Sequence, residues 1–106
     1  ARCSLLRGRP VIPLEDAWAE APVIAVLRGV KPDEVVAVAE ALFSAGVRIV
    51  EVPLNSPQPF ESLGRLAAEV ADRMVIGSGT VLTPQEADRC ADAGGQICVA
   101  PNTDTA

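Results

Sequence analysis

The 106-residue sequence contains no histidine. Histidine is the commonest metal ligand and general base, and its absence also excludes Ser-His and Cys-His nucleophile pairs. The three cysteines, Cys3, Cys90 and Cys98, form no Cys-x-x-Cys pair and predict neither a disulfide framework nor a zinc site. Cys98 lies in an apolar run and is expected to be a small buried hydrophobic residue. Any chemistry must therefore use carboxylates, lysine or backbone groups.

Clustered basic residues and long apolar runs are also missing. Fourteen acidic against nine basic side chains give a net charge of −5, and the basic residues gather nowhere beyond Arg2, Arg7 and Arg9. This charge argues against nucleic-acid and membrane partners. The longest apolar run, 23–27, is far short of the roughly 20 residues of a membrane span, and the first ten residues do not resemble a secretory signal. We expect a soluble, cytoplasmic protein.

A strand–helix unit repeats from residue 22 onward. The segments 23–27, 47–52, 74–76 and 96–100, which are mostly apolar, predict strands spaced by about 25 residues, and the first of them is expected to be covered on both faces. Right-handed crossovers would make these strands parallel. Eight such units, about 200 residues, form a (β/α)₈ TIM barrel. We therefore expect an α/β fold in which 13–106 form the N-terminal half of a barrel, truncated after strand four, and 1–12 form a disordered or mis-started N-terminus.

Helix signals separate the expected strands. Pro32 opens the first helix, Ser56 is expected to cap a second that starts at Pro57, and Thr83-Pro84-Gln85-Glu86 is a capping box. Gly46 and Gly94 lie where helices would end, and a short helix is expected within 13–20. Helical spacing predicts buried faces made of Leu14, Ala17, Trp18, Val35, Val38, Ala39, Leu42, Phe60, Leu63, Ala67 and Val70.

Glu51 is the most informative candidate for chemistry, because catalytic groups of barrels lie at the C-terminal ends of strands. It interrupts an otherwise apolar strand, where an unpaired charge is costly. Burial would raise its pKa toward neutrality, which suits a carboxylate that both accepts and releases a proton. The alternative is a structural ion pair with Arg48 or Arg28.

The other expected strand ends carry weaker signals. Arg28 follows strand one and could bind a carboxylate or phosphate bidentately, or could be a solvated loop residue. Residues 77–80 (GSGT) after strand three predict a tight turn, whose backbone N–H groups and Thr80 hydroxyl could bind an anion. Pro101-Asn102 follow strand four. Lys31, the only lysine, starts a helix and is a poor candidate for a Schiff-base amine.

Four motifs, in order at these strand ends, resemble the 2-keto-3-deoxy-6-phosphogluconate/4-hydroxy-2-oxoglutarate aldolase family. They are 24–29 (IAVLRG), 50–57 (VEVPLNSP), 76–82 (IGSGTVL) and 100–102 (APN). The run around Asn55 looks more like the 2-dehydro-3-deoxy-6-phosphogalactonate branch, since the phosphogluconate branch tends to have arginine there.

The resemblance implies a homotrimeric class I aldolase that needs neither metal nor cofactor. Such an enzyme cleaves a small phosphorylated keto acid into pyruvate and D-glyceraldehyde 3-phosphate through a lysine Schiff base. By position, Glu51 matches the proton-transferring glutamate, and Arg28 and Thr80 match substrate-contacting residues. The family lysine and phosphate site lie on later strands and match nothing in this chain, so the fragment itself is expected to be inactive.

Two further classes of function remain open. A non-catalytic half-barrel would associate with a partner chain through its open strand edges. A small flavodoxin-like binding domain would hold a flavin or nucleotide, although the sequence contains no dinucleotide fingerprint.

Overall fold

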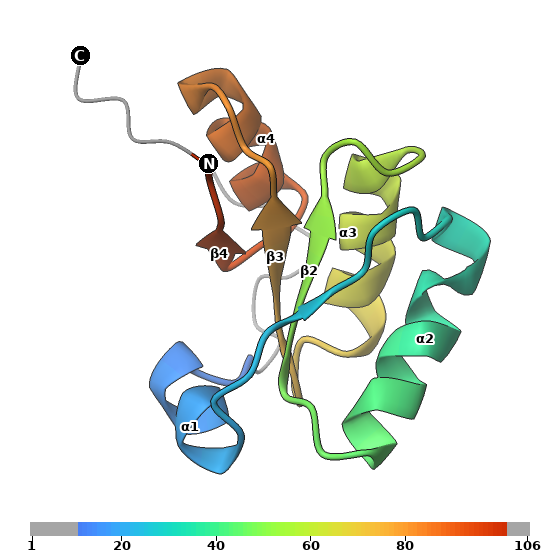
Figure 1. Cartoon of the computed structure of the whole chain (residues 1–106), viewed down its shortest axis with the longest axis vertical. Coiled ribbons are helices and arrows are strands. Elements are labelled where there is room, and N and C mark those ends of the chain that lie inside the picture. Colours follow the sequence, from blue (N-terminus) through green and yellow to red (C-terminus); the bar gives the residue numbers. More distant parts are fainter. Residues whose placement is uncertain (1–10, 102–106) are drawn as a thin grey trace.

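A computed structural model describes residues 11–101, and their backbone forms one parallel four-stranded sheet in the order β1-β2-β3-β4. The strands are β1 (Ala25–Val26), β2 (Ile49–Pro53), β3 (Val75–Gly79) and β4 (Ile97–Cys98). Helices alternate with them, namely α1 (Leu14–Glu20), α2 (Pro32–Ser44), α3 (Pro59–Glu69) and α4 (Pro84–Asp92). The expected alternation of four parallel strands with helices is confirmed (Figure 1).

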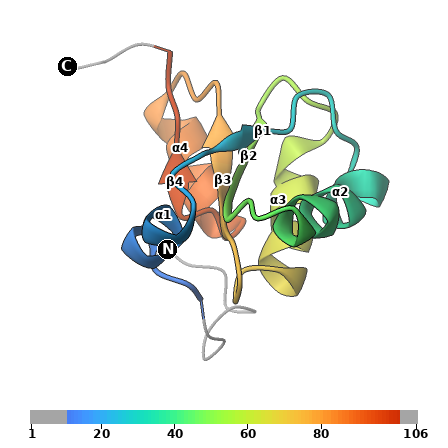
Figure 2. The same ribbon diagram turned by 60° about the horizontal axis from the view of Figure 1, so that its bottom comes forward.

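The sheet has one covered and one largely open face. Helices α2, α3 and α4 lie along one side of it, and α1 lies apart from them at the end where the strands begin (Figures 1 and 2). The main core fills the space between the sheet and α2–α4, and Val50, Val52 and Ile76 are fully buried in it. On the other face, Ala17 of α1 packs on Ile49 and Val75 in a second, smaller cluster.

Strand register decides which residues share the open face. Val26 pairs with Glu51, Glu51 with Gly77, and Gly77 with Ile97. Because paired residues of neighbouring strands point to the same side, these four belong to the open face. The next residues along β3 and β4, Ser78 and Cys98, therefore point toward the helices.

Most of the predicted helix starts and ends are confirmed. Pro32 stands first in α2, and Gly46 and Gly94 follow helices with φ of +105° and +106°. Before α4 the Thr83 hydroxyl accepts from the Glu86 N–H at 3.1 Å, and the Glu86 carboxylate accepts from the Thr83 N–H at 3.2 Å. Both halves of the capping box are thus present.

The predicted start of α3 was wrong. The helix begins at Pro59, with Gln58 before it in the left-handed region at φ +44°, rather than at Pro57. Ser56 does not cap it. Its buried hydroxyl instead accepts from the Gly29 N–H at 3.1 Å, across to the loop after β1. The Pro57-Gln58-Pro59 spacing delays the helix, because a residue before proline is disfavoured in the helical region.

Burial was overestimated where no neighbouring element covers the chain. β1 is shorter than the predicted 23–27, and Val23, Ile24 and Val26 are exposed, so its two faces are not both covered. Cys98, expected to be buried, is exposed on the edge strand β4. Among the expected helical faces, Leu14, Trp18 and Val38 are exposed, whereas Ala17, Val35, Ala39, Leu63, Ala67 and Val70 are buried.

Two remaining predictions concern the chain ends and β3. Residues 1–10 and 102–106 lie outside the described residues, so most of the expected 1–12 N-terminus is not observed, although the Ile12 N–H donates to the Ala71 carbonyl at 3.1 Å. β3 continues through Gly77, Ser78 and Gly79, so the expected tight turn at 77–80 is wrong: these residues are buried strand. No helix within residues 11–101 is long and apolar enough to cross a membrane.

Candidate active site

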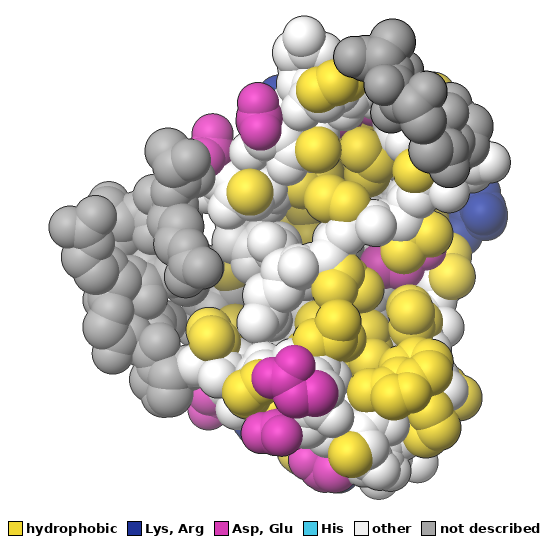
Figure 3. All heavy atoms as spheres, turned by 90° about the vertical axis from the view of Figure 1, so that its left-hand side faces the viewer, with side chains coloured by type: hydrophobic (Ala, Val, Ile, Leu, Met, Phe, Trp, Pro, Cys, Tyr) yellow, Lys and Arg dark blue, Asp and Glu magenta, His cyan; other side chains and the backbone are white. Residues whose placement is uncertain are grey.

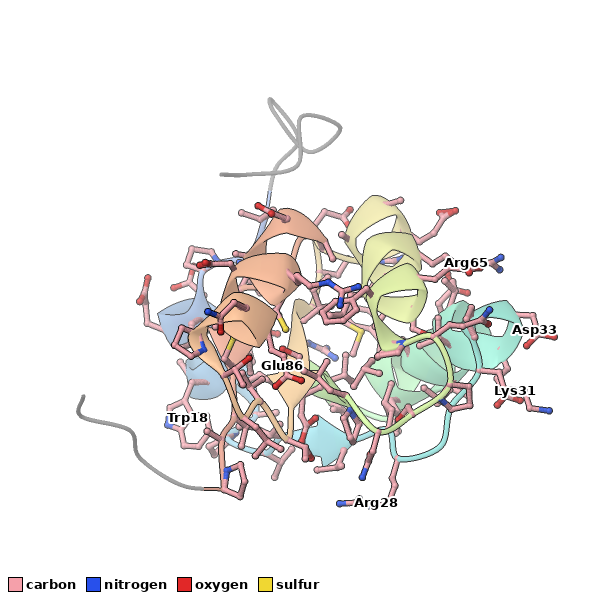
Figure 4. The ribbon with its side chains drawn as sticks, turned by 90° about the horizontal axis from the view of Figure 1, so that it is seen from above. Trp18, Arg28, Lys31, Asp33, Arg65 and Glu86 are labelled. Atoms are coloured by element: carbon pink, nitrogen blue, oxygen red, sulfur yellow. The ribbon has the colours of Figure 1, made fainter. Side chains whose placement is uncertain are left out.

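The candidate residues lie in or directly after three neighbouring parallel strands. Arg28 follows β1 and Thr80 follows β3 directly, whereas Glu51 is the middle residue of β2 and not at the end of that strand as predicted, because β2 continues to Pro53. Parallel strands bring their carboxyl ends to one edge of a sheet, so these residues from distant parts of the sequence become neighbours. Figure 4 views the molecule from this edge, with Arg28 on the side of the sheet away from α3 and α4.

Glu51 is a buried carboxylate that forms no ion pair with another residue of the described range 11–101. Its residue is 5% exposed, and its Oε2 atom has no hydrogen-bond partner among the described residues. Desolvation raises the pKa of Glu51, and the positive charge of Arg28 opposes the rise. The direction of this shift was predicted from the sequence, and the cause is the expected one: burial disfavours the charged form.

The alternative of a structural ion pair is not supported by the contacts. Arg48 Nε instead pairs with Glu20 at 3.0 Å, and Arg48 Nη1 donates to the Phe43 carbonyl at 2.9 Å. Arg28 is exposed, and within the described part of the chain it forms no ion pair with Glu51. The Glu51 carboxylate is therefore available to a ligand that enters from the open face.

Gly79 makes room for this carboxylate. Gly77 pairs with Glu51 in the sheet, so Gly79 lies two residues further along β3 on the same face. A Cβ atom built on Gly79 would overlap the carboxyl group of Glu51, and any side chain there would displace it. This contact could not be predicted from the sequence, because the role of the glycine depends on the register between two strands.

Thr80 has an unusual backbone conformation. Its φ is +56°, in the left-handed region that β-branched residues rarely adopt. Hydrogen bonds fix the chain on both sides: the Leu54 N–H donates to the Gly79 carbonyl at 2.9 Å, and the Val81 N–H donates to the Val99 carbonyl at 3.1 Å. Strained residues of this kind cluster at binding sites, where the surrounding structure maintains them.

The loops after β1 and β2 are joined beside the site. The bond from the Gly29 N–H to the Ser56 hydroxyl connects the residue after Arg28 to the loop that contains Asn55. Gly29 has φ +78°, which glycine adopts without steric cost. Sequence reasoning missed this connection because Ser56 also matched the pattern of a helix cap.

Other candidates lie elsewhere. Lys31 is exposed at the start of α2, where its N–H donates to Glu34 Oε1 at 2.9 Å, and its side chain points outward at the far side from Trp18 (Figure 4). Pro101 is exposed and Asn102 lies outside the described residues. Within residues 11–101 no three potential metal ligands of the His, Cys, Asp or Glu type gather at one place.

Comparison with known proteins identifies the family of this chain. The sequence profile of the KDPG and KHG aldolases matches residues 14–105. The chain belongs to this family. The expected family relationship is therefore confirmed.

Relatives of the galactonate branch are prominent among the matches. A probable 2-dehydro-3-deoxy-6-phosphogalactonate aldolase of Rhizobium meliloti is 45% identical over 82% of this chain, which covers 41% of the relative. The corresponding Escherichia coli enzyme is 46% identical over 76% of this chain and 40% of its own length. A KHG/KDPG aldolase of E. coli is 35% identical over 76% of this chain and 37% of its own length.

Solved structures give the same result. The structure described as "Native KDPGal structure" superposes with a TM-score of 0.78 at 44% identity, over 80% of this chain and 41% of that chain. This chain thus spans about two fifths of the length of the relatives it matches. Those relatives are TIM barrels, so the four strands and their helices correspond to part of a barrel, as predicted from the sequence.

The raised pKa of Glu51 makes stability depend on pH. A carboxyl whose pKa is higher in the folded than in the unfolded chain binds more protons when folded. Its stabilising contribution is therefore complete below the unfolded pKa and is lost as the pH rises through the folded pKa. We expect the free energy of unfolding to fall across this window, and Glu51→Gln to remove that fall.

Urea titrations of the 106-residue chain across a pH series, at concentrations low enough to limit association, measure this effect. Glu69→Gln, which changes an exposed glutamate at the end of α3, is the matched control and should preserve the pH dependence of the parent. An unchanged pH dependence in Glu51→Gln would contradict the assignment of the buried carboxyl.

Proposed function

We propose that this segment supplies the acid/base side of a class I aldolase that cleaves 2-dehydro-3-deoxy-6-phosphogalactonate into pyruvate and D-glyceraldehyde 3-phosphate. The observation that carries the proposal is the buried carboxylate of Glu51 in β2, whose Oε2 atom has no hydrogen-bond partner among the described residues and whose pKa is raised. Membership of the aldolase family, with 45–46% identity to two enzymes of the galactonate branch, supports this substrate.

The proposed step is a retro-aldol cleavage of a substrate held as an imine on a lysine. The C3–C4 bond breaks as the C4 hydroxyl loses its proton and becomes the aldehyde, and the electron pair moves toward the imine and leaves an enamine of pyruvate. Glu51 would accept the C4 proton and later return a proton, a role suited to a carboxyl with a pKa raised toward neutrality. Arg28 and Thr80 would hold the substrate from the neighbouring strand ends. No residue of this chain matches the lysine, which the proposal assigns to a later strand of the barrel.

The galactonate rather than the gluconate epimer is proposed for two reasons. The E. coli galactonate enzyme is 46% identical to this chain, whereas the E. coli KHG/KDPG enzyme is 35% identical. Asn55, where the phosphogluconate branch tends to have arginine, is exposed in the loop after β2 and is thus accessible to a substrate. A homotrimer in the cytoplasm, implied by the family resemblance, remains part of the proposal.

A chimeric barrel tests the function directly. Residues 13–106 would replace the aligned N-terminal segment of the E. coli 2-dehydro-3-deoxy-6-phosphogalactonate aldolase, whose remaining residues complete the barrel. We expect the chimera to cleave the galactonate substrate with a higher kcat/KM than its gluconate epimer. We also expect borohydride to trap pyruvate on the chimera, whereas the 106-residue chain alone gives no adduct on Lys31 or its N-terminus.

Each failure has a distinct meaning. A chimera that folds and traps pyruvate but prefers the gluconate epimer would overturn the substrate assignment alone. A folded chimera that traps pyruvate but cleaves neither epimer would favour a non-catalytic half-barrel. A stoichiometric pyruvate adduct on the 106-residue chain would show that this chain contains its own nucleophile.

A further inference from the structure

One buried hydroxyl lies between two cysteine sulfurs on the helix side of the sheet, away from Glu51. Ser78 of β3 is fully buried, and its Oγ lies 2.5 Å from the Cys90 Sγ of α4 and 3.8 Å from the Cys98 Sγ of β4. Both sulfurs therefore contact the same oxygen atom. Cys90 is fully buried and Cys98 is exposed, so only one of the two thiols is accessible to solvent.

The backbone holds the two cysteines close together. Ser78 and Cys98 are register partners in the paired strands β3 and β4. The chain between α4 and β4 is short and turns tightly, with the Gly95 N–H donating to the Cys90 carbonyl at 2.8 Å. The thiols also interact directly: burial raises the pKa of Cys90, the Ser78 hydrogen bond opposes the rise, and the neighbouring Cys98 thiol adds to it.

We propose that Cys90 and Cys98 are a redox-active thiol pair that small-molecule disulfides, such as oxidised glutathione, convert into an intramolecular disulfide. In the 106-residue chain this modification links α4 to β4 and does not involve Glu51. Reversible oxidation is typical of paired thiols of which one is exposed and a second lies beside it to resolve the first adduct.

The reaction balances in two exchange steps. The Cys98 thiol loses its proton to solvent and attacks the glutathione disulfide, which forms a Cys98–glutathione bond and releases one glutathione thiolate. Cys90 then loses its proton and attacks the Cys98 sulfur, which forms the Cys90–Cys98 bond and releases the second glutathione. The two protein sulfurs are oxidised, and the glutathione disulfide is reduced to two thiols.

The structure assigns a different role to each residue. Cys98 reacts first because it is exposed, and Cys90 is the resolving thiol because burial protects it from the oxidant. The Ser78 hydroxyl donates to the Cys90 sulfur and stabilises its thiolate, so Ser78 is a positioning residue for the second step.

The experiment uses the 106-residue chain with Cys3→Ser, which leaves only the two cysteines of interest. The reduced protein is diluted into glutathione buffers of increasing oxidising ratio, quenched with iodoacetamide at timed intervals, and measured by intact mass and peptide mapping. We expect a transient glutathione adduct on Cys98, followed by a product lighter than the reduced chain by two hydrogen atoms. Dithiothreitol should reverse the change.

Single variants separate the two steps. Cys90→Ser should stop at the glutathione adduct, and Cys98→Ser should remain largely unmodified. Ser78→Ala should prolong the adduct several-fold. Ser62→Ala, which removes another buried serine hydroxyl that has no hydrogen-bond partner among the described residues, should leave the kinetics unchanged.

The proposal is overturned if the parent accumulates a stable glutathione adduct on Cys98, or forms only disulfides between chains, whose yield falls when the oxidation is carried out at lower protein concentration. It is also overturned if both cysteines stay fully alkylated under the most oxidising buffer. If Ser78→Ala and Ser62→Ala slow the second step equally, the role of Ser78 is wrong although the thiol pair stands.

Discussion

Glu51→Gln in the chimeric barrel should lower kcat for the galactonate substrate by about 100-fold or more, because general acid/base catalysis by a positioned side chain contributes on the order of 10² to 10⁴. Glutamine keeps the shape of the side chain and cannot exchange the proton. KM should change little, since the substrate contacts proposed for Arg28 and Thr80 are retained. Steady-state kinetics on both proteins measure this difference.

Glu69→Gln in the same chimera is the control, because Glu69 is exposed at the end of α3. It should retain the kcat of the parent chimera. The circular dichroism spectra and elution volumes of all three proteins should agree, which separates lost chemistry from lost structure. Turnover of the Glu51→Gln chimera within twofold of the parent would refute the acid/base role.

A second substitution distinguishes the position of the carboxylate from its identity. Gly79→Ala retains the Glu51 side chain but adds a Cβ atom where its carboxyl group lies. The carboxylate must shift or the strands must separate, and displacements of about 1 Å can cost about 10²-fold in rate. A Gly79→Ala chimera with a normal kcat would show that the close approach of Glu51 to β3 has no catalytic importance.

The fold was predictable from the sequence where local signals and burial agree. The alternation of apolar runs with Pro-initiated helices identified four parallel strands, and the Thr83–Glu86 capping box formed as expected. The prediction that Ser56 caps a helix was wrong. A serine hydroxyl can accept either from the first turn of a helix or from a distant backbone N–H, and here it accepts from Gly29. The prediction was wrong again at Cys98, since an apolar run reveals hydrophobicity but not which elements cover it.

Some residues of the candidate site could be predicted from the sequence, and others could not. Glu51 could be identified because a charge within an apolar strand is conspicuous in any sequence. The role of Gly79 could not, because it depends on β2–β3 register and on the side-chain position of Glu51. The left-handed Thr80 was equally hidden, since nothing in its sequence neighbourhood requires that conformation. Contacts between strands thus set the limit of what the sequence alone revealed.

The open face gives the other large expected effect: the isolated 106-residue chain should not persist as a stable monomer. Trp18, Val23, Ile24 and Val26 are each at least 42% exposed, as is Leu82 after β3. Figure 3 shows hydrophobic side chains gathered on one side of the molecule. The edge strands β1 and β4 also leave backbone groups unpaired. Apolar patches and free strand edges of this kind favour association.

We therefore expect either aggregation or a dimer in which two four-stranded sheets close against each other. Size-exclusion chromatography with light scattering across a concentration series, from micromolar to millimolar, measures the mass. Val26→Lys places a strongly hydrated charge on the open face of the edge strand β1, where Val26 pairs with Glu51, and should weaken association by about tenfold or more, because the contact would have to remove water from that charge. Val38→Lys changes an exposed valine on α2, and this variant should associate like the parent.

A parent that remains monomeric throughout the series, or two variants that weaken association equally, would show that the open face is not the contact surface. Closure of two such halves would still provide no buried lysine, because Lys31 is the only lysine in each copy and lies at the start of α2.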